Sequence, residues 1–140
     1  MSAAEAIGLR RVTLRLATQY AKERVVLGRP IGQNQGIAHH LAKSWMQLAA
    51  ANMMVRKTAS LYDANQPCGA EANTAKFLAA EAAQDACRTA ILTLGGMGYA
   101  LESHVERFLR ESYIPRIDPA SPRIILNFIS EKVLGLPRSD

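Results

Sequence analysis

The sequence predicts an all-α protein: an up-down four-helix bundle with an additional short C-terminal helix, forming one domain over residues 1–140. The first indication is the stretch 36–65, where apolar residues recur at alternating steps of four and three. The second is the alanine-rich stretch 70–94. The third is the placement of glycine, asparagine and proline between these stretches, where helices end. No segment alternates like a half-buried strand, so no strand is predicted.

The first predicted helix spans residues 1–27. Its apolar positions recur at helical spacing: Ile7, Leu9, Val12, Leu16 and Tyr20. The apolar period runs out at Val26 or Leu27. We expect Gly28 to close this helix in the left-handed conformation, because Pro30 cannot continue it.

The second predicted helix spans residues 36–65. Its apolar stripe consists of Ile37, Leu41, Trp45, Leu48, Asn52, Val55, Ala59 and Tyr62. Trp45 is therefore expected in the core rather than on a base-stacking surface. Asn65, a residue that tolerates the left-handed conformation, and Pro67 are expected to end the helix.

The third predicted helix spans residues 70–94, and its alanines recur on one side: Ala72, Ala75, Ala79, Ala82, Ala83, Ala86 and Ala90. Small side chains let neighbouring helices approach closely, so we expect this helix at the centre of the bundle. Gly95 and Gly96 end it. A short helix is expected over 102–112, supported by a glutamate and an arginine four residues apart.

Residues 114–120 contain two prolines and are expected to be irregular. Ser121 then provides a capping hydroxyl, and Pro122 occupies the first position of the last helix. Its expected apolar face consists of Ile125, Phe128, Ile129 and Val133, and Gly135 and Pro137 close it.

The composition argues against several classes of function. The chain has 17 basic and 12 acidic residues and a net charge of +5, but the basic residues are dispersed, so no nucleic-acid partner is predicted. No apolar run is long enough to span a membrane. Cys68 and Cys87 form no disulfide framework, and the adjacent His39 and His40 do not share a helix face, so no metal site is predicted. We expect a reducing compartment, the cytoplasm or, in a eukaryote, the mitochondrial matrix.

The joint between the first two helices gathers polar side chains. Its donors and acceptors are Arg24, Arg29, Gln33, Asn34 and Gln35. Such a cluster suits an anionic or heteroaromatic ligand. It is also compatible with an ordinary helix-to-helix turn carrying solvated side chains, and spacing alone favours that second interpretation.

The residues 20–35, YAKERVVLGRPIGQNQ, resemble the signature of the acyl-CoA dehydrogenase family, in its C-terminal helical domain. A second family element is LGGMGY at 94–99, and a third is VERFLRE at 105–111. Each is weak alone, but the three together, in this order and spacing, are specific. The resemblance covers nearly the whole chain. In the family the first helix begins further upstream, so we expect this chain to be part of a longer enzyme.

The resemblance implies contacts to FAD across a dimer interface. Arg24 falls on the arginine that meets the FAD pyrophosphate, and Gln35 on a glutamine that contacts the cofactor. Leu27 falls where the family usually has an aromatic side chain against the flavin region, so that contact is expected to be weaker. The turn after the third helix, with Gly96, passes close to the adenosine part of FAD. Leu92 takes the place of a glutamine that often touches FAD there.

The glycine turn at 95–98 is not predicted to be a dinucleotide fingerprint. It lacks the strand before it and the helix directly behind it that such a fingerprint requires.

The chain departs from the family at the catalytic base. Many members have a glutamate that removes the proton alpha to the thioester carbonyl, and Pro119 stands at that position. Asp118 is adjacent and would serve only if the loop shifts; its other interpretation is a turn residue. Other family branches supply the base from the first helix, at a position that falls just before Met1. The base is therefore absent, displaced to Asp118, or upstream.

The resemblance implies a flavin-dependent acyl-CoA dehydrogenase that converts an acyl-CoA to the 2,3-enoyl-CoA. The implied partners are an acyl-CoA substrate, an electron-transfer flavoprotein and further copies of the chain in a homodimer or homotetramer. By itself, this chain is expected to bind FAD weakly and to have no turnover. Two alternatives remain open: a flavin oxidase or monooxygenase on the same scaffold, and a non-catalytic helical oligomerisation or binding module.

Overall fold

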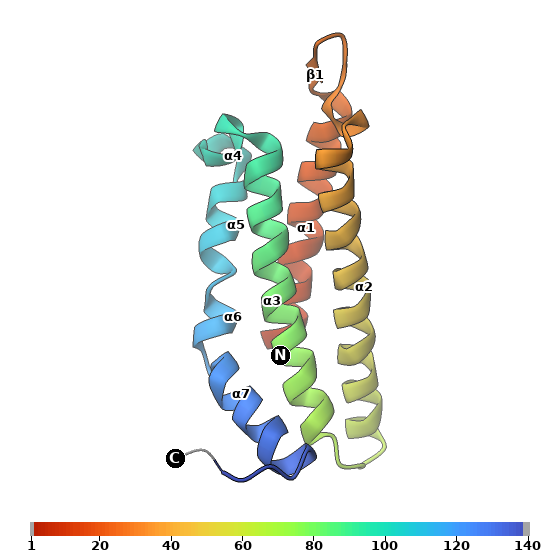
Figure 1. The fold of residues 1–140 in the computed structure, drawn as a ribbon, viewed down its shortest axis with the longest axis vertical. Helices are drawn as coiled ribbons and strands as arrows, with labels where there is room; N and C mark the ends of the chain where they lie inside the picture. Colours follow the sequence, from red (N-terminus) through yellow and green to blue (C-terminus); the bar gives the residue numbers. More distant parts are fainter. Residues whose placement is uncertain (1, 139–140) are drawn as a thin grey trace.

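The computed structural model describes residues 2–138, in which three long helices run side by side (Figure 1). They are α1 (Ser2–Glu23), α2 (Gln35–Asp63) and α3 (Gly69–Leu94). A fourth column returns along α3 and consists of α4 (Gly96–Tyr99), η2 (Leu101–Ser103), α5 (Val105–Glu111), α6 (Ile114–Ile117) and α7 (Pro122–Phe128), followed by the π-helical turn η3 (Ile129–Val133). The predicted all-α, up-down bundle with a short C-terminal helix is confirmed.

Helix α3 lies at the centre of the bundle, as predicted. It packs along α1 and α2 on one side and against α5, α6 and α7 on the other. Its buried alanines are Ala75, Ala79, Ala80, Ala82, Ala83, Ala86 and Ala90. Because methyl groups let the helices come close together, larger side chains of the neighbouring helices, such as Ile7, Leu14 and Leu48, fill the core against them.

The end of the first helix differs from the prediction. α1 stops at Glu23, four residues early, and a two-stranded antiparallel ribbon follows: β1 (Val25–Val26) pairs with β2 (Arg29–Pro30). Leu27 and Gly28 have φ of 52° and 77°, the positive values that a two-residue hairpin turn requires. The left-handed Gly28 is thus confirmed, but it turns a hairpin rather than closing a helix. After the ribbon comes the 3₁₀ turn η1 (Ile31–Gln33).

The buried face of α2 is also shifted from the prediction. Its buried residues are Ser44, Leu48 and Ala51, while Trp45 is 62% exposed and Tyr62 is exposed as well. The prediction of a core tryptophan is wrong because the line that meets α1 and α3 passes through position 44, one residue before it. Among residues 2–138, no helix is both long and apolar enough to cross a bilayer.

Two parts of the fourth column differ from the prediction. Residues 114–117, expected to be irregular, form α6, because Pro115 lies in the first turn, where its missing N–H is harmless. The helix expected over 102–112 begins only at Val105. Ser121 caps α7 as predicted, accepting from the Ile124 N–H at 3.5 Å. The left-handed Asn65, Gly95 and Gly135 stand at helix ends, also as predicted.

Candidate functional site

The joint between α1 and α2 is a compact turn with its own hydrogen bonds. The Ile31 N–H donates to the Arg24 carbonyl at 2.9 Å, and Asn34 Nδ2 donates to the Ile31 carbonyl at 3.1 Å. A Cβ on Gly32 would lie 3.0 Å from the Ala21 carbonyl oxygen, so η1 packs directly on the end of α1. The backbone of the joint is therefore held by the fold, and its outward side chains start from fixed positions.

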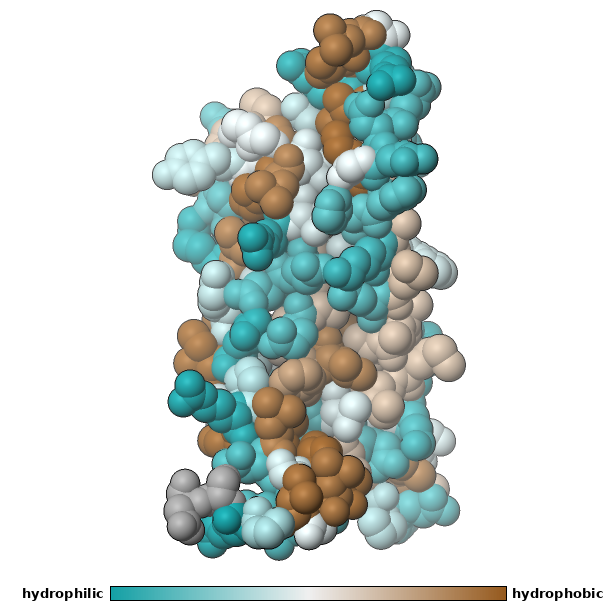
Figure 2. Space-filling model, viewed as in Figure 1, coloured by the Kyte–Doolittle hydropathy of each residue, from teal (hydrophilic) through white to brown (hydrophobic). Residues whose placement is uncertain are grey.

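Most of the polar residues expected at the joint are exposed. Arg24, Arg29, Gln33 and Gln35 are exposed, and Asn34 is half-buried. Arg29 is already engaged, because its NH2 group donates to Asn34 Oδ1 at 2.8 Å. Of the ion pairs within residues 2–138, none includes Arg24, so its guanidinium faces solvent. Leu27 is 98% exposed at the tip of the ribbon, where Figure 2 shows an apolar patch at the top of the molecule.

The glycine turn after α3 uses its three glycines differently. Gly95 has φ of 60° and turns the chain. A Cβ on Gly98 would lie 2.7 Å from the Ile91 carbonyl oxygen, so Gly98 packs on the backbone of α3. A Cβ on Gly96 would meet nothing within 4 Å, and Gly96 is not left-handed. The side-chain space at Gly96 is therefore open to something outside the chain.

A helix does begin directly behind this turn, contrary to the expectation, because α4 starts at Gly96. The exclusion of a dinucleotide fingerprint now rests on what precedes the turn. That element is α3, a helix, whereas the fingerprint needs a strand.

Leu92 lies beside the start of α2. A shallow groove of about 100 Å³ separates the two helices, lined by Gly36, Ile37, His40, Thr89, Leu92 and Thr93. Leu92 is 73% exposed there, and Gln35 immediately precedes the groove. The fold thus brings Leu92 close to the joint, although the two are far apart in sequence, and both lie at the end of the bundle that carries β1 and α4 (Figure 1).

Asp118 lies apart from the joint. It is the C-cap residue of α6, a helix that lies well away from the ribbon (Figure 1), and it is exposed. Its backbone carbonyl accepts from Lys76 Nζ at 2.9 Å. The next residue, Pro119, is exposed and carries no titratable group. Arg24 and Asp118 of one chain therefore do not form one site between them.

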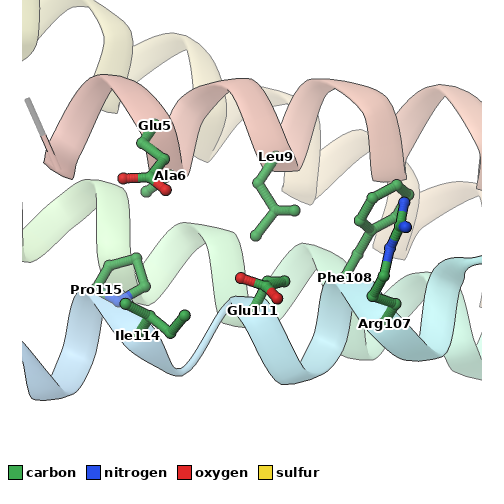
Figure 3. Close-up of a pocket in the computed structure, with 8 residues that line it drawn as sticks. All are labelled: Glu5, Ala6, Leu9, Arg107, Phe108, Glu111, Ile114 and Pro115. Carbon is green, nitrogen blue, oxygen red and sulfur yellow. The ribbon is translucent and has the colours of Figure 1, made fainter.

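A pocket that the sequence did not reveal lies between α1 and the α5–α6 segment (Figure 3). It has a volume of about 310 Å³ and is lined by Glu5, Ala6, Leu9, Arg107, Phe108, Glu111, Ile114 and Pro115. Apolar side chains form most of the wall, and two carboxylates enter from opposite sides. The helical spacing of residues 5 and 9, and of 107, 108 and 111, is the signal that could have placed them together. Such a pocket suits an apolar chain with a polar end.

Two buried groups belong to the core rather than to a site. Cys87 is fully buried, and this burial raises the pKa of its thiol, partly offset by the Thr13 hydroxyl, whose oxygen lies 3.6 Å from Sγ. Burial lowers the pKa of Arg10 to about 10, against the opposing effect of Asp85. Arg10 donates to the Ser44 carbonyl, and within residues 2–138 its Nε and NH1 have no partner.

Comparison with known proteins gives consistent matches over this fold. The family model described as the acyl-CoA dehydrogenase C-terminal domain matches residues 1–134. The acyl-CoA dehydrogenase FadE12 of Mycobacterium tuberculosis is 41% identical over 141 aligned positions, which cover 99% of this chain and 36% of that protein. The chain thus spans about a third of the length of this relative.

Solved structures agree with the sequence match. Butyryl-CoA dehydrogenase from Megasphaera elsdenii superposes with a TM-score of 0.92 at 32% identity, over 95% of this chain and 35% of that one. The FAD complex of PigA superposes with a TM-score of 0.92 at 27% identity, over 96% of this chain and 35% of that one. The expected family is confirmed: this chain belongs to the acyl-CoA dehydrogenase family and corresponds to its C-terminal helical domain.

Proposed function

We propose that this chain is the C-terminal domain of a flavin-dependent acyl-CoA dehydrogenase, which oxidises an acyl-CoA thioester to the 2,3-enoyl-CoA. The observation that carries the proposal is the joint: a backbone fixed by its own hydrogen bonds holds Arg24 and Gln35 outward, with no acidic partner for Arg24 among the described residues. An outward guanidinium on a rigid turn suits a phosphate group of another molecule.

The residues present fit FAD supplied by a sister subunit. Arg24 would meet the pyrophosphate, Gln35 would donate or accept beside it, and the fully exposed Leu27 would be covered by an apolar ring. The open space at Gly96 leaves room for the adenosine part, with Leu92 beside it. When bound, FAD supplies the hydride acceptor of the reaction. The chain's own contribution at this end is to bind and orient.

Asp118 is our candidate for the proton acceptor of this chain, because Pro119 cannot act as a base. Its carboxylate lies near the Lys76 ammonium. In the full-length enzyme, Asp118→Asn should slow substrate-dependent flavin reduction by about 10³-fold if Asp118 is the base. A rate within threefold of the wild type would show that Asp118 is not the base.

The proposed partners are an acyl-CoA, an electron-transfer flavoprotein that reoxidises the flavin, and identical subunits in a dimer or tetramer. We place the enzyme in the cytoplasm, or in the mitochondrial matrix of a eukaryote. Because this chain covers about a third of its relative, we expect it to bind FAD weakly by itself and to have no turnover. A stoichiometric flavin absorbance on the purified 140-residue chain would contradict that expectation.

The test is anaerobic mixing of the full-length, flavin-loaded protein with short-chain and long-chain acyl-CoAs. Bleaching of the flavin by at least one of them supports the dehydrogenase, and no bleaching refutes it. Arg24→Met should weaken flavin retention at least tenfold. The matched control is Arg56→Met, which removes an exposed arginine on α2 away from the joint and should leave flavin retention unchanged.

A further inference from the structure

Lys76 occupies an unusual place for a lysine. It lies on the alanine-rich buried face of α3, next to Ala75 and Ala79, and is only 8% exposed. Lysines are almost never so buried unless the ammonium group has partners, because removing the charge from water is unfavourable. Burial lowers the pKa of Lys76 accordingly, and the nearby Asp118 carboxylate opposes the shift. The fold must therefore compensate for this burial through specific contacts.

Those contacts are two backbone carbonyls about 40 residues further along the chain. Lys76 Nζ donates to the carbonyl of Pro115 and, at 2.9 Å, to that of Asp118. Pro115 lies within α6 and Asp118 is its C-cap residue, and a helix of only four residues leaves such carbonyls without an intrahelical donor. A cation at this end of a helix satisfies the free carbonyls and offsets their partial negative charge.

A second side chain fixes the same segment to α3. Arg116 forms an ion pair with Glu81 at 3.1 Å and donates to Gln84. On the far side of the loop, the Ser121 hydroxyl caps α7. Only residues 118–120 lie between α6 and this cap, so the position of the loop is set by what holds α6.

We propose that Lys76 is a positioning residue, which holds the segment 115–120 in the place from which it bounds the acyl-CoA site. The inference rests on the proposed function, because the resemblance places the family's base position at Pro119 within this segment. Lys76 acts through the two carbonyls and touches no substrate. Losing its ammonium therefore frees the loop, while the packing of α1 against α3 through their other buried residues remains.

The experiment compares Lys76→Met with Lys57→Met in the full-length, flavin-loaded protein. Methionine keeps the length and the apolar stem but removes the donors. Lys57 is the matched control, because it is an exposed lysine of α2 that pairs with the half-buried Glu71 of α3 rather than with the segment 115–120. The first readout is hydrogen exchange of the amides in 114–121. The second is the steady-state kinetics with acyl-CoA.

For Lys76→Met we expect exchange in 114–121 to accelerate at least tenfold, with the amides of α1 unchanged. We expect kcat/KM to fall 10- to 100-fold through both a lower kcat and a higher KM, and Lys76→Arg to recover part of the loss. Lys57→Met should stay within twofold of the wild type in both readouts. Unchanged exchange in Lys76→Met, or faster exchange with unchanged kcat/KM, would overturn the proposal.

Two other outcomes need their own measurements: a Lys76→Met variant that does not fold, and a wild-type flavin that no acyl-CoA reduces. Should Lys76→Met not fold, Arg116→Gln weakens the second contact of the same segment and should raise exchange and lower kcat/KM by about threefold; no change in either would overturn the proposal. Should no acyl-CoA reduce the wild-type flavin, the proposed function fails, and with it the catalytic role of Lys76. Exchange would then still decide whether Lys76 holds the loop.

Discussion

Two glycines of the turn after α3 should respond in opposite ways to the same substitution. A Cβ at Gly98 would lie 2.7 Å from the Ile91 carbonyl oxygen and 2.9 Å from its Cα, distances that real Cβ atoms essentially never show. Both atoms are backbone, so they cannot move aside, and α4 must shift away from α3. We expect Gly98→Ala to lower the free energy of unfolding by about 2 kcal/mol, within the range typical of overpacking.

Gly96→Ala should leave the stability of the chain almost unchanged. Its Cβ would meet no atom within 4 Å, and Gly96 lies at the first position of α4 without a left-handed φ. Replacing glycine by alanine in such a conformation stabilises by about 0.5 kcal/mol, because the unfolded chain loses freedom. In the full-length protein, however, the added methyl group enters the space that we assign to FAD, so flavin affinity should fall at least tenfold.

Thermal unfolding of the 140-residue chain and flavin titration of the full-length protein measure the two effects separately. About 2 kcal/mol corresponds to a decrease of about 8 °C in Tm for Gly98→Ala, whereas Gly96→Ala should keep or slightly raise the Tm. Equal destabilisation by both substitutions would refute the different roles assigned to the glycines. Unchanged flavin affinity in Gly96→Ala would remove Gly96 from the proposed site.

Three other substitutions or modifications test the interior and the last helix. Burial raises the pKa of the Cys87 thiol, so iodoacetamide at pH 8 should label only the half-buried Cys68 in the folded chain. In denaturant it should label both thiols. Rapid labelling of Cys87 in the folded chain would contradict its burial. Ser121→Ala should lower the free energy of unfolding by about 0.5–1 kcal/mol, seen as a lower urea midpoint at constant m-value, because it removes the cap of α7. Burial lowers the pKa of Arg10 to about 10, so Arg10 is charged at neutral pH. Burying this charge lowers the free energy of unfolding. That destabilisation is fully present below about pH 10 and is relieved only as the pH rises above it. At pH 7, Arg10→Met should therefore either raise the free energy of unfolding or lower it by less than about 1 kcal/mol. A decrease of more than about 3 kcal/mol would show that the hydrogen bond from Arg10 to the Ser44 carbonyl outweighs the effect of burying the charge.

The long elements could be predicted from the sequence because their ends depend on single residues. Asn65 and Gly95 are residues that tolerate positive φ, and both stand where a helix stops. The ribbon after α1 could not be predicted, because a two-residue strand has no period to detect and residues 20–24 continue a helical pattern. The contact of η1 with the end of α1 is tertiary, and a local pattern does not contain it.

Which residues face the core, and which form sites, depends on neighbours that the sequence does not identify. Trp45 and Ser44 both fit a helical stripe, and the smaller one is buried because α1 and α3 lie close together there. Lys76 reads as an isolated charge in an alanine-rich helix, and its role becomes visible only with the carbonyls of Pro115 and Asp118 in contact. The motifs at 20–35 and 94–99 are informative through their resemblance to the family, since spacing alone favours an ordinary turn.

The separation of Arg24 and Asp118 within one chain has a consequence for the assembled enzyme. If Arg24 holds the flavin of a sister subunit, each active site combines Asp118 of one subunit with Arg24 of the other. A dimer of one Arg24→Met subunit and one Asp118→Asn subunit then has one site with both defects and one site with none. If Arg24 holds the flavin of its own subunit, both sites of that dimer carry one defect.

Mixed dimers therefore distinguish the two arrangements without a structure of the complex. Differently tagged full-length variants can be co-expressed and the mixed species isolated by two affinity steps, with the two parent homodimers as controls. Lys76→Met can replace Asp118→Asn if the latter retains activity, because Lys76 holds the segment that contains Asp118. We expect the mixed dimer to recover about half of the wild-type rate per dimer. A rate no higher than the mean of the two parent variants would refute the placement of Arg24 at the flavin of a neighbouring subunit, since sites with one defect each cannot complement one another.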